Sequence, residues 1–256
     1  MSDPMNATTQ AHTLLLRLAA PLQSWGTQSR FSERDAGREP SKSGVIGLLC
    51  AALGRPREAD VSDLAALRMG VRIDRPGSLK VDYHTAGGTH RAGDRYGVAE
   101  VGGGTRTVVS HRYYLSDADF LVGLESKDED LLRRLDEALA DPHWPLFLGR
   151  RAFVPGEPVR LPDDPPLGPG LREGSLDDTL RRYAWPGSPQ RPLPFIRGWS
   201  VSQRLQLVLD ADPAADDSDA MREMRRDVPI SFESANRLFD VRYVTIAWAI
   251  RPEVFP

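Results

Sequence analysis

Apolar and polar positions at the start of the chain predict a buried strand, a polar loop and a helix. Thr13–Leu18 is a short, nearly continuous apolar run, which is typical of a buried strand. The stretch 19–40 is polar and charged and predicts a loop. A helix is expected to open at Ser43, because the apolar residues that follow recur on one wide face as far as Gly54, a favoured C-terminal cap residue.

The middle of the chain shows the period-two alternation of half-buried strands. Met69–Asp74 alternates between apolar and polar residues, and the run 79–83 continues the alternation. A polar, glycine-rich segment, 85–105, separates this run from a further strand-like run, Thr107–Leu115. The simplest interpretation is a long β-hairpin with a mobile tip. Phe120–Leu124 predicts another strand.

A second helix and a last strand complete the predicted unit. The segment 128–140 is amphipathic, with acidic residues in its first turn and leucines on one face. A final strand is expected within 147–159. The succession of elements predicts an α+β fold: a ferredoxin-like (RRM-like) βαββαβ core over residues 12–160, with an extended β-hairpin at about 80–115.

The two ends of the chain are expected to be organised differently. Residues 1–11 are polar and predict a flexible N-terminal extension. Beyond residue 160 prolines interrupt regular structure, but strands are predicted at 205–209 and 241–250. Residues 161–256 therefore form either a C-terminal β-rich elaboration packed on the core or a second small sheet.

Composition limits the class of protein. The formal net charge of −3 argues against a generic nucleic-acid coat, although most of the cations are arginines, which suit phosphate and base contacts. Taken alone, this composition is better explained by a GC-rich genome, which favours arginine codons. The single cysteine, Cys50, excludes a disulfide framework and a cysteine-built zinc site. No apolar stretch approaches the roughly 20 residues of a membrane span and no signal peptide is evident, so we expect a cytoplasmic protein.

Enzyme signatures are sparse. The sequence has no GxSxG elbow, no Walker A lysine, no HExxH motif and no paired-cysteine metal spacing, so we expect no metal and no cofactor. A metal-independent ribonuclease needs a base, an acid and a cation, which Lys80, Tyr83, His84 and His111 could supply. Strand alternation sends Tyr83 and His84 to opposite faces, and each histidine is better explained by a hydrogen-bonded structural role.

Anion-binding signals are stronger. Ser41–Gly44 stands at the start of the first helix, where free N–H groups, Lys42 and the Ser43 hydroxyl suit a phosphate. Simple N-capping by Ser43 is compatible with this interpretation. The loop before it interleaves Trp25 and Phe31 with arginines, a combination that suits a single RNA strand, although Glu33, Asp35 and Glu39 dilute its positive charge. These loop arginines are Arg30, Arg34 and Arg38.

Five segments in the same order resemble the CasD family, the Cascade subunit of type I-E CRISPR systems that holds the 5′ end of the guide RNA. The segments are Leu16–Gly26 (LRLAAPLQSWG), Pro40–Leu49, Asp82–Thr85 (DYHT), Arg112–Phe120 and Leu148–Arg151 (LGRR). The resemblance spans Leu14 to about Pro158, whereas the C-terminal third matches only loosely.

The resemblance implies a function and a set of residues. It implies a non-catalytic, RNA-binding subunit of a bacterial antiviral complex, with an RRM-like core and a long hairpin called the thumb. The implied partners are the 5′ handle of the crRNA, the Cascade backbone subunit, the large subunit that reads the PAM and, through the complex, target DNA. An endoribonuclease that processes repeat RNA is the alternative. The expected RNA contacts are Gln23, Ser24, Trp25, Arg30, Lys42, Ser43, Arg112, Arg150 and Arg151, with His84 and His111 on the thumb.

Overall fold

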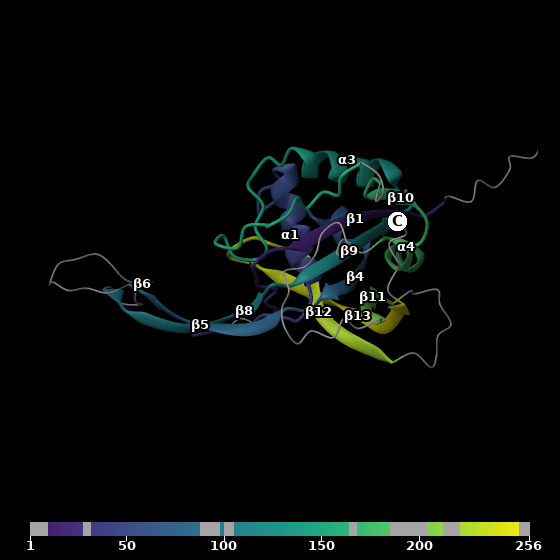
Figure 1. Cartoon of the computed structure of the whole chain (residues 1–256). Coiled ribbons are helices and arrows are strands. Elements are labelled where there is room, and N and C mark those ends of the chain that lie inside the picture. The colour runs from purple at the N-terminus through teal and green to yellow at the C-terminus, as the bar shows by residue number, and fades with distance from the viewer. Residues whose placement is uncertain are drawn as a thin grey trace, which may run out of the picture.

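The computed structural model describes residues 10–27, 32–87, 98–99, 105–163, 168–184, 204–211 and 221–250. Its centre is a seven-stranded antiparallel sheet, from which a long hairpin extends to one side (Figure 1). In spatial order the strands of this sheet are β10 (Leu171–Glu173), β1 (His12–Ala19), β9 (Asp119–Ser126), β4 (Arg68–Arg75), β11 (Arg204–Asp210), β13 (Leu238–Ile250) and β12 (Arg222–Ser231).

Helices and two smaller groups of strands complete the fold. The helices of the described residues are α1 (Lys42–Leu53), α2 (Ser62–Ala65), α3 (Glu129–Ala140) and α4 (Leu176–Arg182). The extending hairpin consists of β5 (Ser78–Ala86) and β8 (Val108–Ser116), and we call it the thumb. Two short strands join β8, namely β2 (Leu22–Gln23) and β3 (Glu33–Arg34), and β6 (Val98–Ala99) pairs with β7 (Thr105–Arg106).

The α+β prediction is confirmed. Strand β1, helix α1, strand β4, strand β9, helix α3 and strand β10 follow one another along the chain, with the thumb inserted between β4 and β9. Their spatial order, β10-β1-β9-β4, and their antiparallel pairing are consistent with a ferredoxin-like unit. The mobile tip that we expected within 85–105 lies largely outside the described residues.

Strand β1 explains how the sheet is covered on both faces. Leu14, Leu16 and Leu18 are fully buried in one apolar core together with residues of α1 and α3, as the alternation of a strand requires. Leu15, which points the other way, is fully buried in a second core with leucines of α4. A strand with helices on both sides needs apolar residues at successive positions, which accounts for the unbroken run of leucines.

The last strand of the ferredoxin-like unit is not within 147–159, so that prediction was wrong; the strand is β10. In 147–159 the backbone forms a loop, in which the Leu148 N–H donates to the Phe153 carbonyl over 2.8 Å. Gly149 has a φ of +95°, which is outside the range of a strand. The prolines in the second half of the segment also lack the N–H that a strand ladder needs.

The C-terminal strands β11, β13 and β12 lie in the same sheet as the core and extend it at the edge formed by β4. They continue the ladder directly, since Val208 of β11 pairs with Val71 of β4 and with Ile246 of β13. Most of the N-terminal extension, 1–9, lies outside the described residues. No helix of the described residues is long and apolar enough to cross a membrane.

Candidate nucleic-acid interface

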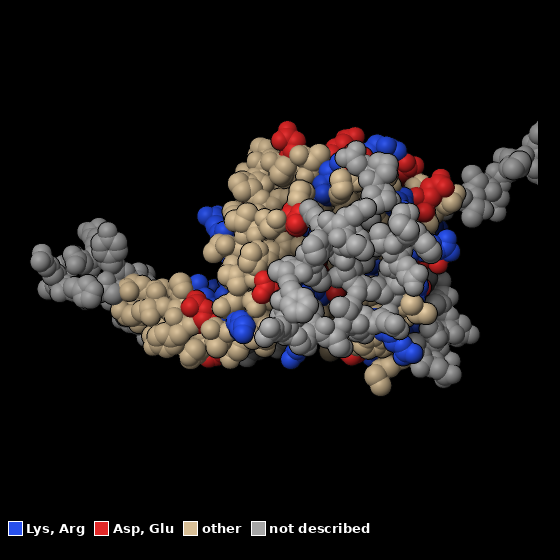
Figure 2. Space-filling view, viewed as in Figure 1, with Lys and Arg blue, Asp and Glu red and all other residues tan. Residues whose placement is uncertain are grey.

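The thumb has two chemically different faces. Strands β5 and β8 pair in register from Ser78 opposite Ser116 to Ala86 opposite Val108, and residues directly opposite each other share a face. One face, the polar face, carries Lys80, Asp82, His84, Ser110, Arg112 and Tyr114. The other, the apolar face, carries Leu79, Val81, Tyr83, Val109, His111 and Tyr113. Basic side chains, with acidic ones among them, gather where the thumb joins the body (Figure 2).

Three arginines converge at the base of the polar face, and we call Arg34, Arg112 and Arg150 the arginine cluster. Strand β3 pairs with β8 so that Arg34 lies directly opposite Arg112. The Arg112 Nε donates to the Ser110 hydroxyl over 3.0 Å. Arg150 comes from the loop after α3, and its Nη2 donates to the Tyr113 carbonyl over 3.0 Å.

The three guanidinium groups repel one another. The pKa of Arg150 is lowered by partial burial and then by the positive charges of Arg112 and Arg34. The pKa of Arg112 is lowered by partial burial and then by Arg34, while Asp82 opposes the shift. In each case the charged form is destabilised. An anion placed among the three groups would remove this repulsion.

The arginine cluster differs from many arginines of the body, which form ion pairs with carboxylates. Arg17 lies 2.6 Å from Asp119, and Arg55 lies 2.6 Å from Asp63. By contrast, no carboxylate of the described residues lies within ion-pair distance of the cluster arginines. The ion-paired arginines of the body stabilise contacts within the fold, whereas no ion pair with the described residues balances the positive charges of the arginine cluster.

Gln23 and Trp25 are internal, so our expectation that they contact RNA is corrected. Both side chains are almost completely buried. The Gln23 amide donates to the carbonyls of Leu18 and Ala118, and its oxygen accepts from the Trp25 indole over 3.0 Å. These bonds satisfy the polar atoms of both residues within the fold. Ser24 is also buried, and its hydroxyl donates to the Tyr113 carbonyl over 3.2 Å.

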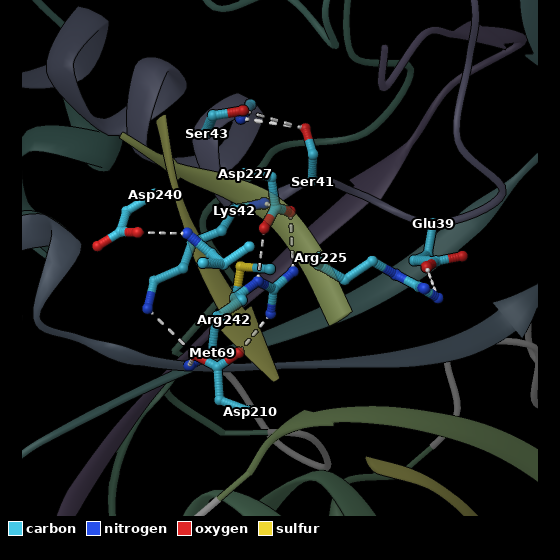
Figure 3. Close-up of polar contacts among 12 residues, drawn as sticks. Glu39, Ser41, Lys42, Ser43, Met69, Asp210, Arg225, Asp227, Asp240 and Arg242 are labelled. Carbon is cyan, nitrogen blue, oxygen red and sulfur yellow. Dashed lines mark hydrogen bonds and ion pairs between the residues drawn. The ribbon is translucent and has the colours of Figure 1, made fainter. Parts of the chain in front are cut away.

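Lys42 is buried too, which corrects its expected role at a phosphate. Its Nζ donates to Asp210 over 3.1 Å, and its backbone N–H donates to Asp227 over 2.7 Å. Arg242 donates to both carboxylates, which completes a buried cluster of two cations and two anions (Figure 3). The protein's own carboxylates therefore occupy the N-terminus of α1, where we expected a phosphate of the RNA.

Helix α1 begins at Lys42, one residue earlier than predicted. The N-cap is Ser41, whose hydroxyl accepts from the Gly44 N–H over 3.3 Å, and not Ser43. Ser43 is half-buried, with its hydroxyl 3.5 Å from that of Ser41. At the other end of the helix the prediction is confirmed, because Gly54 is the C-terminal cap, with a φ of 70°.

The other arginines that we expected to contact RNA are not buried in the fold as Gln23 and Lys42 are, or lie outside the described residues. Arg151 is exposed beside Arg150, and Arg30 lies outside the described residues. Arg34, which the sequence indicates only as one of three loop arginines, belongs to the arginine cluster. Strand β3, which aligns it, has only two residues, and such a short pairing leaves no periodic signal in the sequence.

The residues proposed for a ribonuclease are divided between the two faces of the thumb. On the apolar face, the Tyr83 and His111 rings lie 5.7 Å apart, and the His111 Nδ1 is 2.9 Å from Glu33. On the polar face, the His84 Nδ1 lies 3.4 Å from Asp82, on the same side as Lys80. The described residues also contain no group of three or more His, Cys, Asp or Glu side chains that could hold a metal.

Comparison with known proteins gives consistent results. The family model described as CRISPR-associated protein (Cas_Cas5) matches residues 13–245. The CRISPR system Cascade subunit CasD of Escherichia coli (strain K12) is 35% identical over 162 residues, which are 58% of this chain and 69% of that protein. A chain of a CRISPR RNA-guided surveillance complex is 33% identical with a TM-score of 0.71, over 94% of this chain and 91% of that one. A structure described as a Cas protein is 41% identical with a TM-score of 0.67, over 95% of this chain and 100% of that one.

Proposed function

The chain belongs to the Cas5 family of CRISPR-associated proteins, and from this premise we propose that it is a Cascade subunit that holds the 5′ handle of the crRNA. In this proposal it caps the backbone of the complex for antiviral defence and does not itself cut RNA. The observation that carries the proposal is the arginine cluster, because three unpaired guanidinium groups at one surface suit the phosphates of a nucleic acid.

The position of the arginine cluster supports a single RNA strand as its ligand. Arg34, Arg112 and Arg150 come from three segments that meet at the base of the thumb. The Arg150 guanidinium lies 5.7 Å from the centre of the Phe153 ring, which in turn lies 5.9 Å from the Tyr114 ring. Cations beside aromatic rings bind single strands through backbone charge and base stacking.

A single substitution tests the site. Replacing Arg112 by alanine removes a cation that the fold does not use in an ion pair. We expect about a tenfold loss of affinity for fluorescein-labelled crRNA and a decrease of about 0.7 in the slope of log affinity against log salt concentration. The measurement is fluorescence anisotropy with the full chain at several KCl concentrations.

Arg134→Ala is the matched control for this substitution. Arg134 is exposed on α3, so replacing it by alanine removes the same charge from a different surface. The control should leave the affinity and the salt slope almost unchanged. Equal losses from the two variants would contradict the assignment of Arg112 to the RNA site.

The apolar face of the thumb supports a protein partner, for which we propose the backbone subunit. Leu79, Val81, Tyr83 and Val109 are 44%, 53%, 66% and 37% exposed, so nothing in the described chain covers this face. Exposed apolar residues gathered on one face mark a site of protein contact. Within the complex, the large subunit that reads the PAM and the target DNA are further proposed partners.

Val81→Asp separates this contact from RNA binding. A charge in the middle of the apolar face should sharply reduce the amount of backbone subunit that copurifies with the chain from the assembled complex, because a buried unpaired charge is costly. The crRNA affinity of the isolated chain should change less than about twofold. Val241→Asp, at an exposed valine of β13, is the control. Unchanged copurification with Val81→Asp would remove the apolar face from the interface.

The division of the histidines between the two faces supports a non-catalytic role. A general acid and a general base must both reach the scissile phosphate. Tyr83 and His111 point to the apolar face, whereas Lys80 and His84 point to the polar face. A strand of RNA on either face would meet only part of this set, so we favour binding over cleavage.

A further inference from the structure

Arg150 is held by a tight loop whose shape depends on one close backbone contact. The Leu148 N–H donates to the Phe153 carbonyl over 2.8 Å, and the Phe153 N–H donates to the Arg150 carbonyl over 2.8 Å. The loop is joined to the segment after β1 by a bond from the Ser24 N–H to the Leu148 carbonyl over 3.0 Å. Arg150 is thus placed by backbone contacts that begin two residues before it.

Gly149 is the point of closest approach in this loop. Its φ of +95° lies in the region that side-chain-bearing residues rarely adopt. A Cβ atom on Gly149 would lie 1.8 Å from the Ser24 carbonyl oxygen, which is part of the backbone and cannot rotate away. Any side chain at this position would force the loop and the Ser24 segment apart.

A carbonyl group of the thumb holds both the segment that Gly149 approaches and the side chain of Arg150. The Tyr113 carbonyl accepts both the Ser24 hydroxyl, over 3.2 Å, and the Arg150 Nη2, over 3.0 Å. One acceptor on β8 therefore ties together the Ser24 segment and the loop. The neighbouring residue on β8 is Arg112, so this acceptor holds the Arg150 guanidinium close enough to Arg112 for the charge of Arg112 to lower the pKa of Arg150.

We infer that Gly149 and Ser24 are positioning residues for Arg150, which together set the geometry of the phosphate site at the base of the thumb. This inference rests on the proposed RNA-binding function and deepens it. Neither residue offers the RNA a side chain of its own, since Gly149 has none and Ser24 is buried and bonded to Tyr113. Their effect on RNA is transmitted through Arg150.

A double-mutant cycle tests the inference. The full chain and its variants Gly149→Ala, Arg150→Ala and Gly149→Ala/Arg150→Ala are titrated with fluorescein-labelled crRNA at several salt concentrations. We expect Gly149→Ala and Arg150→Ala each to weaken binding about tenfold and to lower the salt slope by about the same amount. The double variant should bind no more weakly than Arg150→Ala, because the effect of Gly149 passes through Arg150.

Gly54→Ala is the matched control. Gly54 also has a positive φ, and a Cβ there would lie 2.7 Å from the His143 ring, at the end of α1. This variant should lower stability without changing the RNA affinity. If Gly149→Ala does not fold, the cycle is run with Ser24→Ala, which removes only the bond to Tyr113, and about a threefold loss that disappears in the Arg150→Ala background is expected.

The outcomes separate the inference from the proposed function. If the unsubstituted chain does not bind crRNA, or if Arg150→Ala has no effect, the proposed function is wrong. If Arg150→Ala weakens binding but the losses from Gly149→Ala and Arg150→Ala add in the double variant, the function stands and the positioning inference is overturned.

Discussion

Replacing Asp210 by alanine is expected to lower the free energy of unfolding by about 3–5 kcal/mol, because it leaves two buried cations without a full set of partners. Asp210 accepts from the Lys42 Nζ over 3.1 Å, from the Met69 N–H over 2.9 Å and from Arg242. Burial lowers the pKa of Arg242, but the bond to Asp227 and the charges of Asp210 and Asp227 outweigh it, so that the pKa is raised.

Urea denaturation followed by circular dichroism measures this loss. Asp240→Ala is the control, since Asp240 is exposed on β13 and accepts from its neighbour Val241. It should change the free energy of unfolding by less than about 0.5 kcal/mol. A loss from Asp210→Ala as small as that of the control would mean that the buried cluster does not hold α1 to the C-terminal strands.

The buried cluster also explains why the C-terminal strands belong to the same folding unit as the core. Lys42 opens α1, Met69 lies at the start of β4, and Asp210, which ends β11, accepts hydrogen bonds from both. Asp227 on β12 then bonds the first N–H of α1. A helix of the first part of the chain is therefore capped by residues of the last part.

Much of the fold could be predicted because its signals are local. The unbroken leucines of β1, the alternation of β4 and the amphipathic pattern of α3 each report the burial of one element. The final strand could not be predicted in the same way. The apolar residues of 147–159 look strand-like, but the close approach of Gly149 to Ser24 bends that segment into a loop.

The candidate site was predicted in part. The sequence directed attention to Arg112 and Arg150, which the structure brings together, and their role in binding RNA stays a proposal. The sequence also indicated Lys42 as a phosphate contact, which is wrong. The partners of this lysine are Asp210 and Asp227, which lie 168 and 185 residues away in the chain. A lysine before a helix has the same local pattern whether its partner is a phosphate or a distant carboxylate.

Gln23 and Trp25 show the same limit. An aromatic residue beside polar ones in a loop is a pattern of RNA-binding surfaces, but here the indole N–H bonds the Gln23 side chain inside the core. Arg34 shows the converse, because a two-residue strand aligns it with Arg112. In each case long-range contacts that are absent from any local pattern decide which side chains are buried and which join the arginine cluster.

The second large effect is expected from reversing all three charges of the arginine cluster. In Arg34→Glu/Arg112→Glu/Arg150→Glu the cations become anions, so attraction to phosphate becomes repulsion. We expect the affinity for crRNA to fall by more than about 100-fold and the salt slope to decrease by about two, as the loss of three phosphate contacts on a single strand requires.

A matched triple variant removes the effect of net charge. Arg134→Glu/Arg182→Glu/Arg237→Glu makes the same change at three exposed arginines of α3, α4 and the turn before β13. Because both variants carry the same charge, any general electrostatic effect on RNA is common to them. Thermal melting establishes that both are folded before RNA is added.

The salt-dependent crRNA affinity of these two triple variants tests most directly whether the base of the thumb is the RNA site. We expect that the arginine-cluster variant loses binding and most of its salt dependence, while the matched variant stays within about fivefold of the unsubstituted chain. Equal losses in the two variants, or full binding by the arginine-cluster variant, would contradict this expectation.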